Sequence, residues 1–216
     1  MFDAVIFDLD GVLTDTARYH FLAWGRLAAG EGIPFDEGFN ERLKGIDRMG
    51  SLELILSQSG RPYTPAEKLA LAERKNHHYQ ELIAGMSSRD LLPGALNALD
   101  TVRAAGLKVG LASVSKNAPL VLAKLGIADR FDDIVDARQI ARGKPDPEIF
   151  LTAANHLHVE PARSIGVEDA VAGIQAIKAA GMYAVGVGNA SVLTGADCVI
   201  PGLEAFCLSD YVRTQR

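Results

Sequence analysis

Two aspartates near the amino terminus, Asp8 and Asp10, stand two positions apart at the end of an apolar run, residues 4–9. The run is rich in β-branched and aromatic residues, so it predicts a buried strand that carries both carboxylates into a loop, where Gly11 permits a sharp turn. Two carboxylates this close repel each other unless a cation lies nearby or one is protonated. The pair suits a metal site in which one carboxylate is a nucleophile and the other an acid or base. An Asx-rich turn that caps the following helix is the alternative.

A second acidic pair, Glu168 and Asp169, also follows a predicted strand and precedes a helix that begins near Ala170. Carboxylates at this position can cap the helix, which is the structural alternative. Hard oxygen ligands favour Mg²⁺, which proteins commonly bind through one or two carboxylates together with water and phosphate. If Asp8 and Asp10 lie at a neighbouring strand end, the four acids form one Mg²⁺ site.

Two further loops carry groups suited to an anion. Ser113 opens the loop Ser113-Val114-Ser115-Lys116-Asn117 after a strand, and its hydroxyl and nearby backbone N–H groups could bind a phosphoryl oxygen at a helix amino terminus. Ser115 and Asn117 could equally be simple helix caps. Lys144, in Gly143-Lys144-Pro145, could offset phosphate charge near the acids, or be a surface lysine ahead of a helix that begins with proline.

The elements that must position these loops alternate in type along the chain. Strands are predicted at 4–9, 107–112, 134–135, 164–167 and 183–187, and helices at 118–125, 147–157 and 171–180. This alternation indicates an α/β fold with a Rossmann-like parallel sheet. Ligands of such sheets bind beyond the carboxyl ends of the strands, where the four loops above would meet.

One segment breaks the alternation. Residues 16–87 contain no convincing strand, only amphipathic helical patterns at 19–29, 49–57 and 66–83 separated by turn signals. We therefore expect a core domain formed by residues 1–15 and 88–216, and a helical cap domain, residues 16–87, inserted after the first strand.

The composition excludes some function classes. The net charge of −5 offers no electrostatic attraction to nucleic acid or to an anionic membrane. No apolar stretch approaches the ~20 residues of a membrane span, and the two cysteines, Cys198 and Cys207, form no disulfide framework. We expect a cytoplasmic protein that binds neither nucleic acid nor membrane, and a monomer.

Taken in order, the acidic loop, the serine loop, the lysine loop and the second acidic loop, with helices inserted after the first strand, resemble the haloacid dehalogenase superfamily over the whole chain. The resemblance implies that Asp8 is the nucleophile and becomes an aspartyl-phosphate, and that Asp10 is the general acid and base. Superfamily dehalogenases lack an aspartate two residues after the nucleophile and ion-pumping ATPases carry threonine there. Asp10 thus argues for phosphatase or mutase chemistry.

Stretches of the predicted cap resemble more closely the sugar-phosphate mutases of this superfamily, which interconvert β-glucose 1-phosphate and β-glucose 6-phosphate. These stretches include Leu43-Lys44-Gly45-Ile46-Asp47-Arg48 and Arg74-Lys75-Asn76. The residues that the resemblance assigns to substrate binding are Asp10, Thr16, His20, Trp24, Lys44, Gly45, Ile46, Arg48, Ser51, Lys75, Ser113, Val114, Ser115, Lys116, Asn117 and Lys144.

Within this set, the planar guanidinium of Arg48 suits a second phosphate distant from the nucleophile, unless Arg48 is only a solvated surface residue. The resemblance also implies that Thr16, His20 and Lys75 help to position Asp10 as the cap closes. Trp24 could pack on the sugar or only within the cap. The chain departs from the usual pattern at Asp47, where serine is expected, and an acid there either weakens the phosphate site or points to solvent.

The resulting hypothesis is a mutase that uses Mg²⁺ and needs β-glucose 1,6-bisphosphate as a primer, with small sugar phosphates as its partners. The first alternative is a phosphatase of the same fold that hydrolyses small sugar phosphates. A non-catalytic sugar-phosphate binding protein is the second, and the full set of acids argues against it.

Overall fold

The computed structural model describes residues 2–43 and 46–213 of the 216-residue chain. The chain forms two compact units: one consists of the residues up to Asp15 and from Ser87 onward, and the other of Thr16–Met86. We call them the sheet unit and the helical unit, and each is described by itself.

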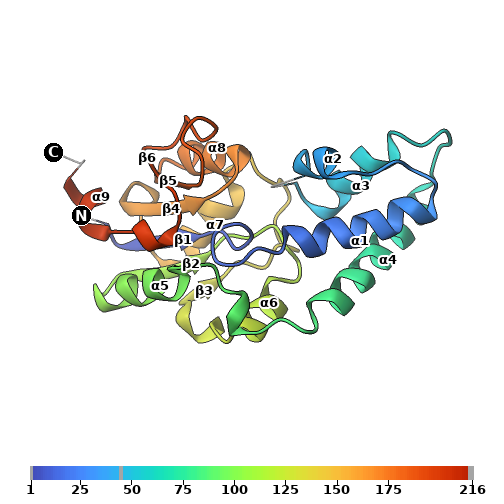
Figure 1. Ribbon diagram of the computed structural model, residues 1–216. Coiled ribbons are helices and arrows are strands. Elements are labelled where there is room, and N and C mark those ends of the chain that lie inside the picture. Colours follow the sequence, from blue (N-terminus) through green and yellow to red (C-terminus); the bar gives the residue numbers. More distant parts are fainter. Residues whose placement is uncertain (1, 44–45, 214–216) are drawn as a thin grey trace. The chain divides into compact units, whose positions relative to one another are not determined.

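The sheet unit contains six parallel strands in the order β3-β2-β1-β4-β5-β6 (Figure 1). The strands are β1 (Ala4–Phe7), β2 (Lys108–Leu111), β3 (Asp133–Ile134), β4 (Ser164–Glu168), β5 (Tyr183–Val187) and β6 (Cys198–Ile200). The predicted α/β class with a parallel sheet is confirmed. Strand β6 was not predicted, because three residues at the edge of a sheet give almost no periodic pattern.

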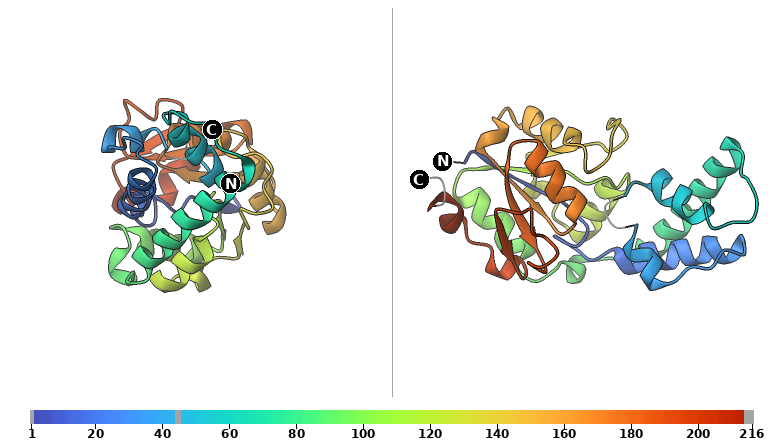
Figure 2. Two further views of the ribbon diagram at one scale, coloured as in Figure 1. Left: turned by 90° about the vertical axis from the view of Figure 1, so that its right-hand side faces the viewer. Right: turned by 90° about the horizontal axis from the view of Figure 1, so that it is seen from above.

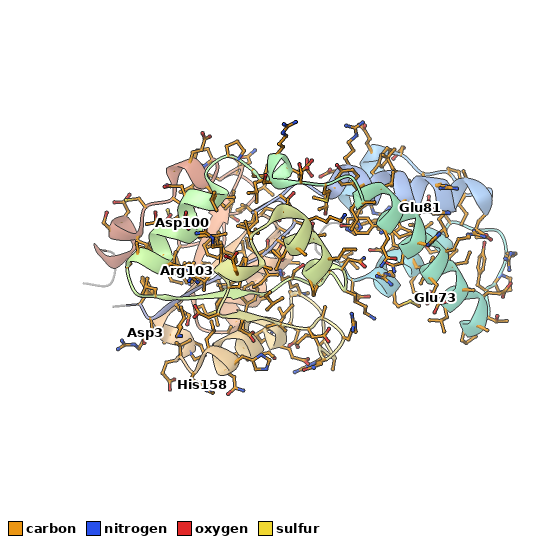
Figure 3. All side chains as sticks on the ribbon, turned by 90° about the horizontal axis from the view of Figure 1, so that it is seen from below. Asp3, Glu73, Glu81, Asp100, Arg103 and His158 are labelled. Carbon is orange, nitrogen blue, oxygen red and sulfur yellow. The ribbon has the colours of Figure 1, made fainter. Side chains whose placement is uncertain are left out.

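Helices cover both faces of this sheet. They are α5 (Ala95–Ala104), α6 (Ala118–Leu125), α7 (Glu148–Leu157), α8 (Val171–Ala179) and α9 (Leu208–Arg213), with 3₁₀ turns η1 (Ser88–Asp90), η2 (Ala128–Arg130), η3 (Pro161–Arg163) and η4 (Leu203–Ala205). Figure 1 shows α7 and α8 on one face and α5 on the other. Helix α5, whose outer side carries the exposed residues Asp100 and Arg103, was not predicted from the sequence (Figure 3).

Successive side chains of β1 point to opposite faces of the sheet and pack against the residues that cover each face. Ala4 and Ile6 join the buried cluster that contains Ile149 of α7 and Ile177 of α8. Phe7 points to the opposite face, where its ring centroid lies 6.0 Å from that of Phe206. Because β1 is buried on both faces, its end is held firmly in the middle of the sheet.

The helical unit contains α1 (Ala17–Gly30), α2 (Glu37–Glu41), α3 (Arg48–Leu56) and α4 (Pro65–Ile83). The long helices α1 and α4 lie side by side (Figure 2). They share a buried cluster with α3 that includes Trp24, Leu27 and Ile55. The start of α4 has a complete capping box, in which Thr64 and Glu67 satisfy each other's backbone N–H groups.

The three helices predicted in this segment are confirmed as α1, α3 and α4, whereas the five-residue α2 was not predicted. Within residues 2–43 and 46–213, none of the helices has the length and the apolar composition that a membrane span requires.

Candidate active site

The carboxyl ends of β1 and β4 bring two acidic residues together. The strands pair in parallel with Phe7 opposite Val167, so Asp8 follows β1 beside Glu168, the last residue of β4. The Asp8 N–H donates to the Val167 carbonyl oxygen at 2.9 Å, which extends the ladder to the functional residue itself. Both side chains are buried. The register of the sheet therefore fixes the separation of these two carboxylates.

Lys144 lies between them. Its Nζ donates to Oδ1 of Asp8 at 2.7 Å and to Oε1 of Glu168 at 3.0 Å, and its side chain is 1% exposed. Burial alone would lower the pKa of Lys144, but the two carboxylates raise it above its ordinary value, so the lysine is a cation. The surface-lysine alternative is excluded by this burial.

Hydrogen bonds to Glu148 fix the loop that carries Lys144. The Glu148 carboxylate accepts the backbone N–H groups of Ala141 and Arg142 at 2.8 and 2.9 Å, which ties the loop to the start of α7. This role of Glu148 was not predicted, because it depends on a backbone turn that has no residue-type signal.

Glu168 is engaged on both of its oxygens. While Oε1 accepts from Lys144, Oε2 accepts the N–H groups of Asp169 and Ala170 at 2.5 and 3.0 Å. These two residues precede α8, and its N-cap, Ala170, has no side-chain capping bond. Glu168 therefore orders the loop before α8 and does not act as the helix cap that the sequence left open.

Three carboxylates form a candidate cation site. One oxygen each of Asp8, Glu168 and Asp169 lie within 4.8 Å of one another. Burial, together with the charges of neighbouring carboxylates, raises the pKa of Asp8 to about 7, although Lys144 opposes this rise. The same causes raise the pKa of Asp169 to about 8. Two buried carboxylates and one half-buried carboxylate, which together carry excess negative charge, offer hard oxygen ligands that fit Mg²⁺, and the ion would favour their ionised forms.

Asp10, the fourth predicted metal ligand, is not in this group of three carboxylates. It lies in a tight turn in which Gly11 has a φ of 79° and donates its N–H to the Thr14 carbonyl oxygen at 2.8 Å. Asp10 is half-buried, and its charge contributes to the raised pKa of Asp8. The turn places Asp10 near Asp8 in an environment that is less enclosed, so the two carboxylates differ chemically.

The serine loop follows β2, the other neighbour of β1. Ser113 is 1% exposed, and its Oγ accepts the Ser115 N–H at 3.2 Å; the Ser115 Oγ accepts the Asn117 N–H at 3.3 Å. Ser115 thus orders the turn before α6, and the N-cap Asn117 makes no side-chain capping bond. Val114 is half-buried and Lys116 is exposed. The strand order places this loop at the same edge of the sheet as Asp8.

In the helical unit, Lys75 of α4 contacts two predicted site residues of α1, His20 and Trp24. Its Nζ lies 2.8 Å from Nδ1 of His20 and 4.4 Å from the centroid of the Trp24 ring. Burial and the charges of Lys75 and Arg48 hold the pKa of His20 well below its usual range, so His20 is neutral and its Nδ1 accepts from Lys75. Trp24 is 2% exposed within the core of this unit, which favours the packing alternative over contact with a sugar.

Arg48 is held by Asn76, a residue that was not among the predicted site residues. Its Nη2 donates to Oδ1 of Asn76 on α4 at 2.8 Å. Arg48 is half-buried, and burial lowers its pKa, so it is no freely solvated surface side chain. Asn76 stands in the Arg-Lys-Asn stretch, but only the packing of α3 against α4 reveals its contact with Arg48.

Asp47 has a structural role. Its Oδ1 accepts the N–H groups of Met49 and Gly50 at 2.8 and 3.1 Å, which makes it the N-cap of α3. The prediction that this acid weakens a phosphate site or points to solvent did not include capping, although aspartate before a helical pattern is a standard capping signal.

The remaining predicted residues of this segment contribute differently. Ser51 is buried and its Oγ donates to the Ile46 carbonyl oxygen at 3.4 Å, and Thr16 is buried at the start of α1. Lys44 and Gly45 lie outside the described residues.

Comparisons with known proteins agree with one another. The family model of haloacid dehalogenase-like hydrolases matches residues 2–181. A beta-phosphoglucomutase of Bacillus subtilis is 56% identical over 199 residues, which cover 91% of this chain and 88% of the relative. The crystal structure of a beta-phosphoglucomutase from Clostridium difficile superimposes with a TM-score of 0.95 at 47% identity, covering 99% of this chain and 96% of the other.

A hydrolase is also similar to the chain. A fructose-1-phosphate phosphatase of Escherichia coli is 32% identical over 187 residues, which cover 85% of this chain and 95% of the relative. The chain is therefore similar in sequence to both a mutase and a phosphatase, and its identity to the Bacillus subtilis mutase, 56%, is higher than its identity to the Escherichia coli phosphatase, 32%.

Proposed function

The chain belongs to the haloacid dehalogenase-like hydrolase family, and we propose that it acts as a β-phosphoglucomutase, an isomerase that interconverts β-glucose 1-phosphate and β-glucose 6-phosphate. The proposal rests most on the buried Asp8, which is paired with Lys144 beside a candidate cation site, in a chain 56% identical to a known mutase. Such a carboxylate is a suitable nucleophile for phosphoryl transfer.

The reaction begins with Asp8 carrying a phosphoryl group donated by β-glucose 1,6-bisphosphate, the primer. When β-glucose 1-phosphate is bound, Asp10 takes the proton of the sugar 6-hydroxyl. The 6-oxygen attacks phosphorus and the bond from phosphorus to the Asp8 carboxylate breaks. Lys144 offsets the negative charge of the group in transfer.

The second half of the cycle reverses these roles. The 1,6-bisphosphate turns end for end, and Asp8 attacks the phosphorus of the 1-phosphate. Asp10 returns its proton to the departing 1-oxygen, and glucose 6-phosphate leaves. Asp8, Glu168 and Asp169 would hold Mg²⁺, which when bound would supply further positive charge next to the transferring phosphoryl group.

The other residue roles follow from the resemblance. We assign Ser113 and Lys144 to the transferring phosphate. Arg48 and the Ser115-Lys116-Asn117 loop are assigned to the second phosphate. Gly45 and Ile46 are assigned to the approach of the backbone to the sugar, Lys44 to substrate binding, and Thr16, His20 and Lys75 to the positioning of Asp10. We further propose that the protein is a cytoplasmic monomer whose partners are small sugar phosphates, and that it binds neither nucleic acid nor membrane.

One incubation tests the proposal. The protein is mixed with β-glucose 1-phosphate, Mg²⁺ and a trace of β-glucose 1,6-bisphosphate, and glucose 6-phosphate and free phosphate are both measured. We expect glucose 6-phosphate to form at the rate at which substrate disappears, and no turnover without the primer. Release of free phosphate at that rate, with no glucose 6-phosphate, would show a phosphatase instead, as the similarity to the fructose-1-phosphate phosphatase allows.

Substitution of the nucleophile separates an enzyme from a binding protein. Asp8→Asn keeps the shape of the side chain but removes the nucleophilic carboxylate, so we expect it to abolish turnover and formation of the aspartyl-phosphate. Unchanged turnover in Asp8→Asn would overturn the assignment of Asp8.

A further inference from the structure

Glu168 lies against a glycine of the helix that follows it. Gly173 is in α8, and a Cβ atom built on it would overlap the Cγ, the Cδ and one carboxylate oxygen of Glu168. A glycine inside a helix is less favourable than an alanine, because it loses more backbone entropy on folding. Gly173 has an ordinary helical φ, so its backbone conformation does not require glycine. The requirement comes from the Glu168 side chain.

The Glu168 side chain has little freedom to move away from such a Cβ. It is 1% exposed, and its two oxygens accept three hydrogen bonds, from Lys144 Nζ and from the N–H groups of Asp169 and Ala170. A displacement large enough to relieve the overlap would break some of these bonds. Because Lys144 also holds Asp8, the displacement would reach the nucleophile.

We propose that Gly173 is a positioning residue of the active site: its missing Cβ provides the space in which Glu168 lies, and Glu168 in turn holds Lys144 against Asp8 and completes the cation site. The role in catalysis rests on the proposed function, whereas the steric role of Gly173 does not.

Two other glycines serve as matched controls. A Cβ on Gly166 of β4 would also be crowded, but by the apolar side chain of Ile177 and not by a polar group. A Cβ on Gly25 of α1 would meet its nearest neighbour, Phe35, at 3.7 Å, which is ordinary van der Waals contact. Gly166→Ala therefore reports damage to packing alone, and Gly25→Ala reports the effect of alanine in an uncrowded helix.

The test is a double-mutant cycle between Gly173→Ala and Glu168→Ala in the full chain. Thermal unfolding without metal, Mg²⁺ affinity by calorimetry and turnover of β-glucose 1-phosphate are measured for each variant. We expect Gly173→Ala to weaken Mg²⁺ binding about 10–100-fold, the usual range for residues that orient metal ligands. We expect the double variant to have the same unfolding temperature, Mg²⁺ affinity and turnover as Glu168→Ala alone, or better ones, because removing the Glu168 side chain removes the overlap.

The controls should behave differently. Gly25→Ala should leave Mg²⁺ affinity and turnover unchanged, and Gly166→Ala should lower the unfolding temperature by the same amount with and without Glu168→Ala. If Gly173→Ala does not fold, folding of the double variant supports the proposal, and failure of both overturns it.

Two other results overturn the proposal. One is wild-type Mg²⁺ affinity in Gly173→Ala, and the other is that the effects of Gly173→Ala and Glu168→Ala on the unfolding temperature and on Mg²⁺ affinity are additive. The unfolding and Mg²⁺ measurements need no substrate. A non-additive cycle in a protein that does not convert β-glucose 1-phosphate would therefore leave the positioning role intact and refute the proposed function.

Discussion

The ammonium nitrogen of Lys144 lies 2.7 Å from Oδ1 of Asp8, and both side chains are buried. A buried pair of this kind contributes little net stability, because desolvation offsets much of the attraction, but removing one partner leaves an uncompensated charge. Substitution of Lys144 therefore tests both its role in phosphoryl transfer and its effect on the stability of the folded protein.

Replacement of Lys144 by methionine keeps most of the unbranched side chain and removes its charge. We expect turnover to fall at least ~100-fold, because the positive charge aimed at the transferring group is lost. We also expect stability to fall by about 3–5 kcal/mol above pH 8, and by less at pH 6, where protonation of the carboxylates removes the unpaired charge. Denaturant unfolding at both pH values measures this, and an equal loss at both would contradict the buried-pair argument.

The raised pKa values of Asp8 and Asp169 predict how stability depends on pH. Between the ordinary aspartate pKa of 3.8 and about 7–8, the folded protein binds more protons at these sites than the unfolded chain. Stability without metal should therefore be greatest at low pH within this range, and should fall as pH rises until it levels above about 8. Unfolding temperatures in EDTA from pH 5 to 8.5 test this sign.

Mg²⁺ should cancel that decline, because it binds the ionised carboxylates and stabilises the folded state. Asp169→Asn should also reduce the decline in EDTA, since it removes one of the titrating groups. A stability in EDTA that rises between pH 5 and pH 8 would contradict the environments described for Asp8 and Asp169.

Asn76 holds the guanidinium of Arg48, so its loss should weaken substrate binding. We expect Asn76→Ala to raise KM about tenfold with a smaller effect on kcat, which corresponds to loss of one hydrogen bond to a charged group. Asn97→Ala, at an exposed position of α5, is the matched control and should leave KM unchanged. An unchanged KM in Asn76→Ala would mean that Arg48 needs no support from α4.

Asp47 caps α3, and two substitutions separate the effect of its capping hydrogen bonds on stability from the effect of its negative charge on KM. Asp47→Ala should cost about 1 kcal/mol of stability, because the Met49 and Gly50 N–H groups lose their acceptor. Asp47→Ser keeps a capping oxygen, so it should retain most of that stability and leave KM within about twofold. A large fall in KM in Asp47→Ser would show that the carboxylate weakens the phosphate site after all.

The sequence alone determined the sheet and the loops at its edge. Short apolar strands that lead to Asp8, Ser113 and Glu168 give local patterns, and the carboxyl ends of parallel strands must lie at one edge, so the placement of these residues at the same edge could be predicted. The alternation of strands with helices likewise fixed the fold class. These inferences succeeded because each depends on a few neighbouring residues and a general rule of topology.

Only the tertiary structure decided which side chains contact which. Trp24 could serve a sugar or a core, and the packing of α1 on α4 buried it. The residue types around Asn76 and Gly173 do not show that these residues lie against Arg48 and Glu168, because each contact joins two different elements of the fold. Contacts between distant segments depend on how helices and strands pack at the scale of single atoms, and a linear pattern of residue types does not specify that packing.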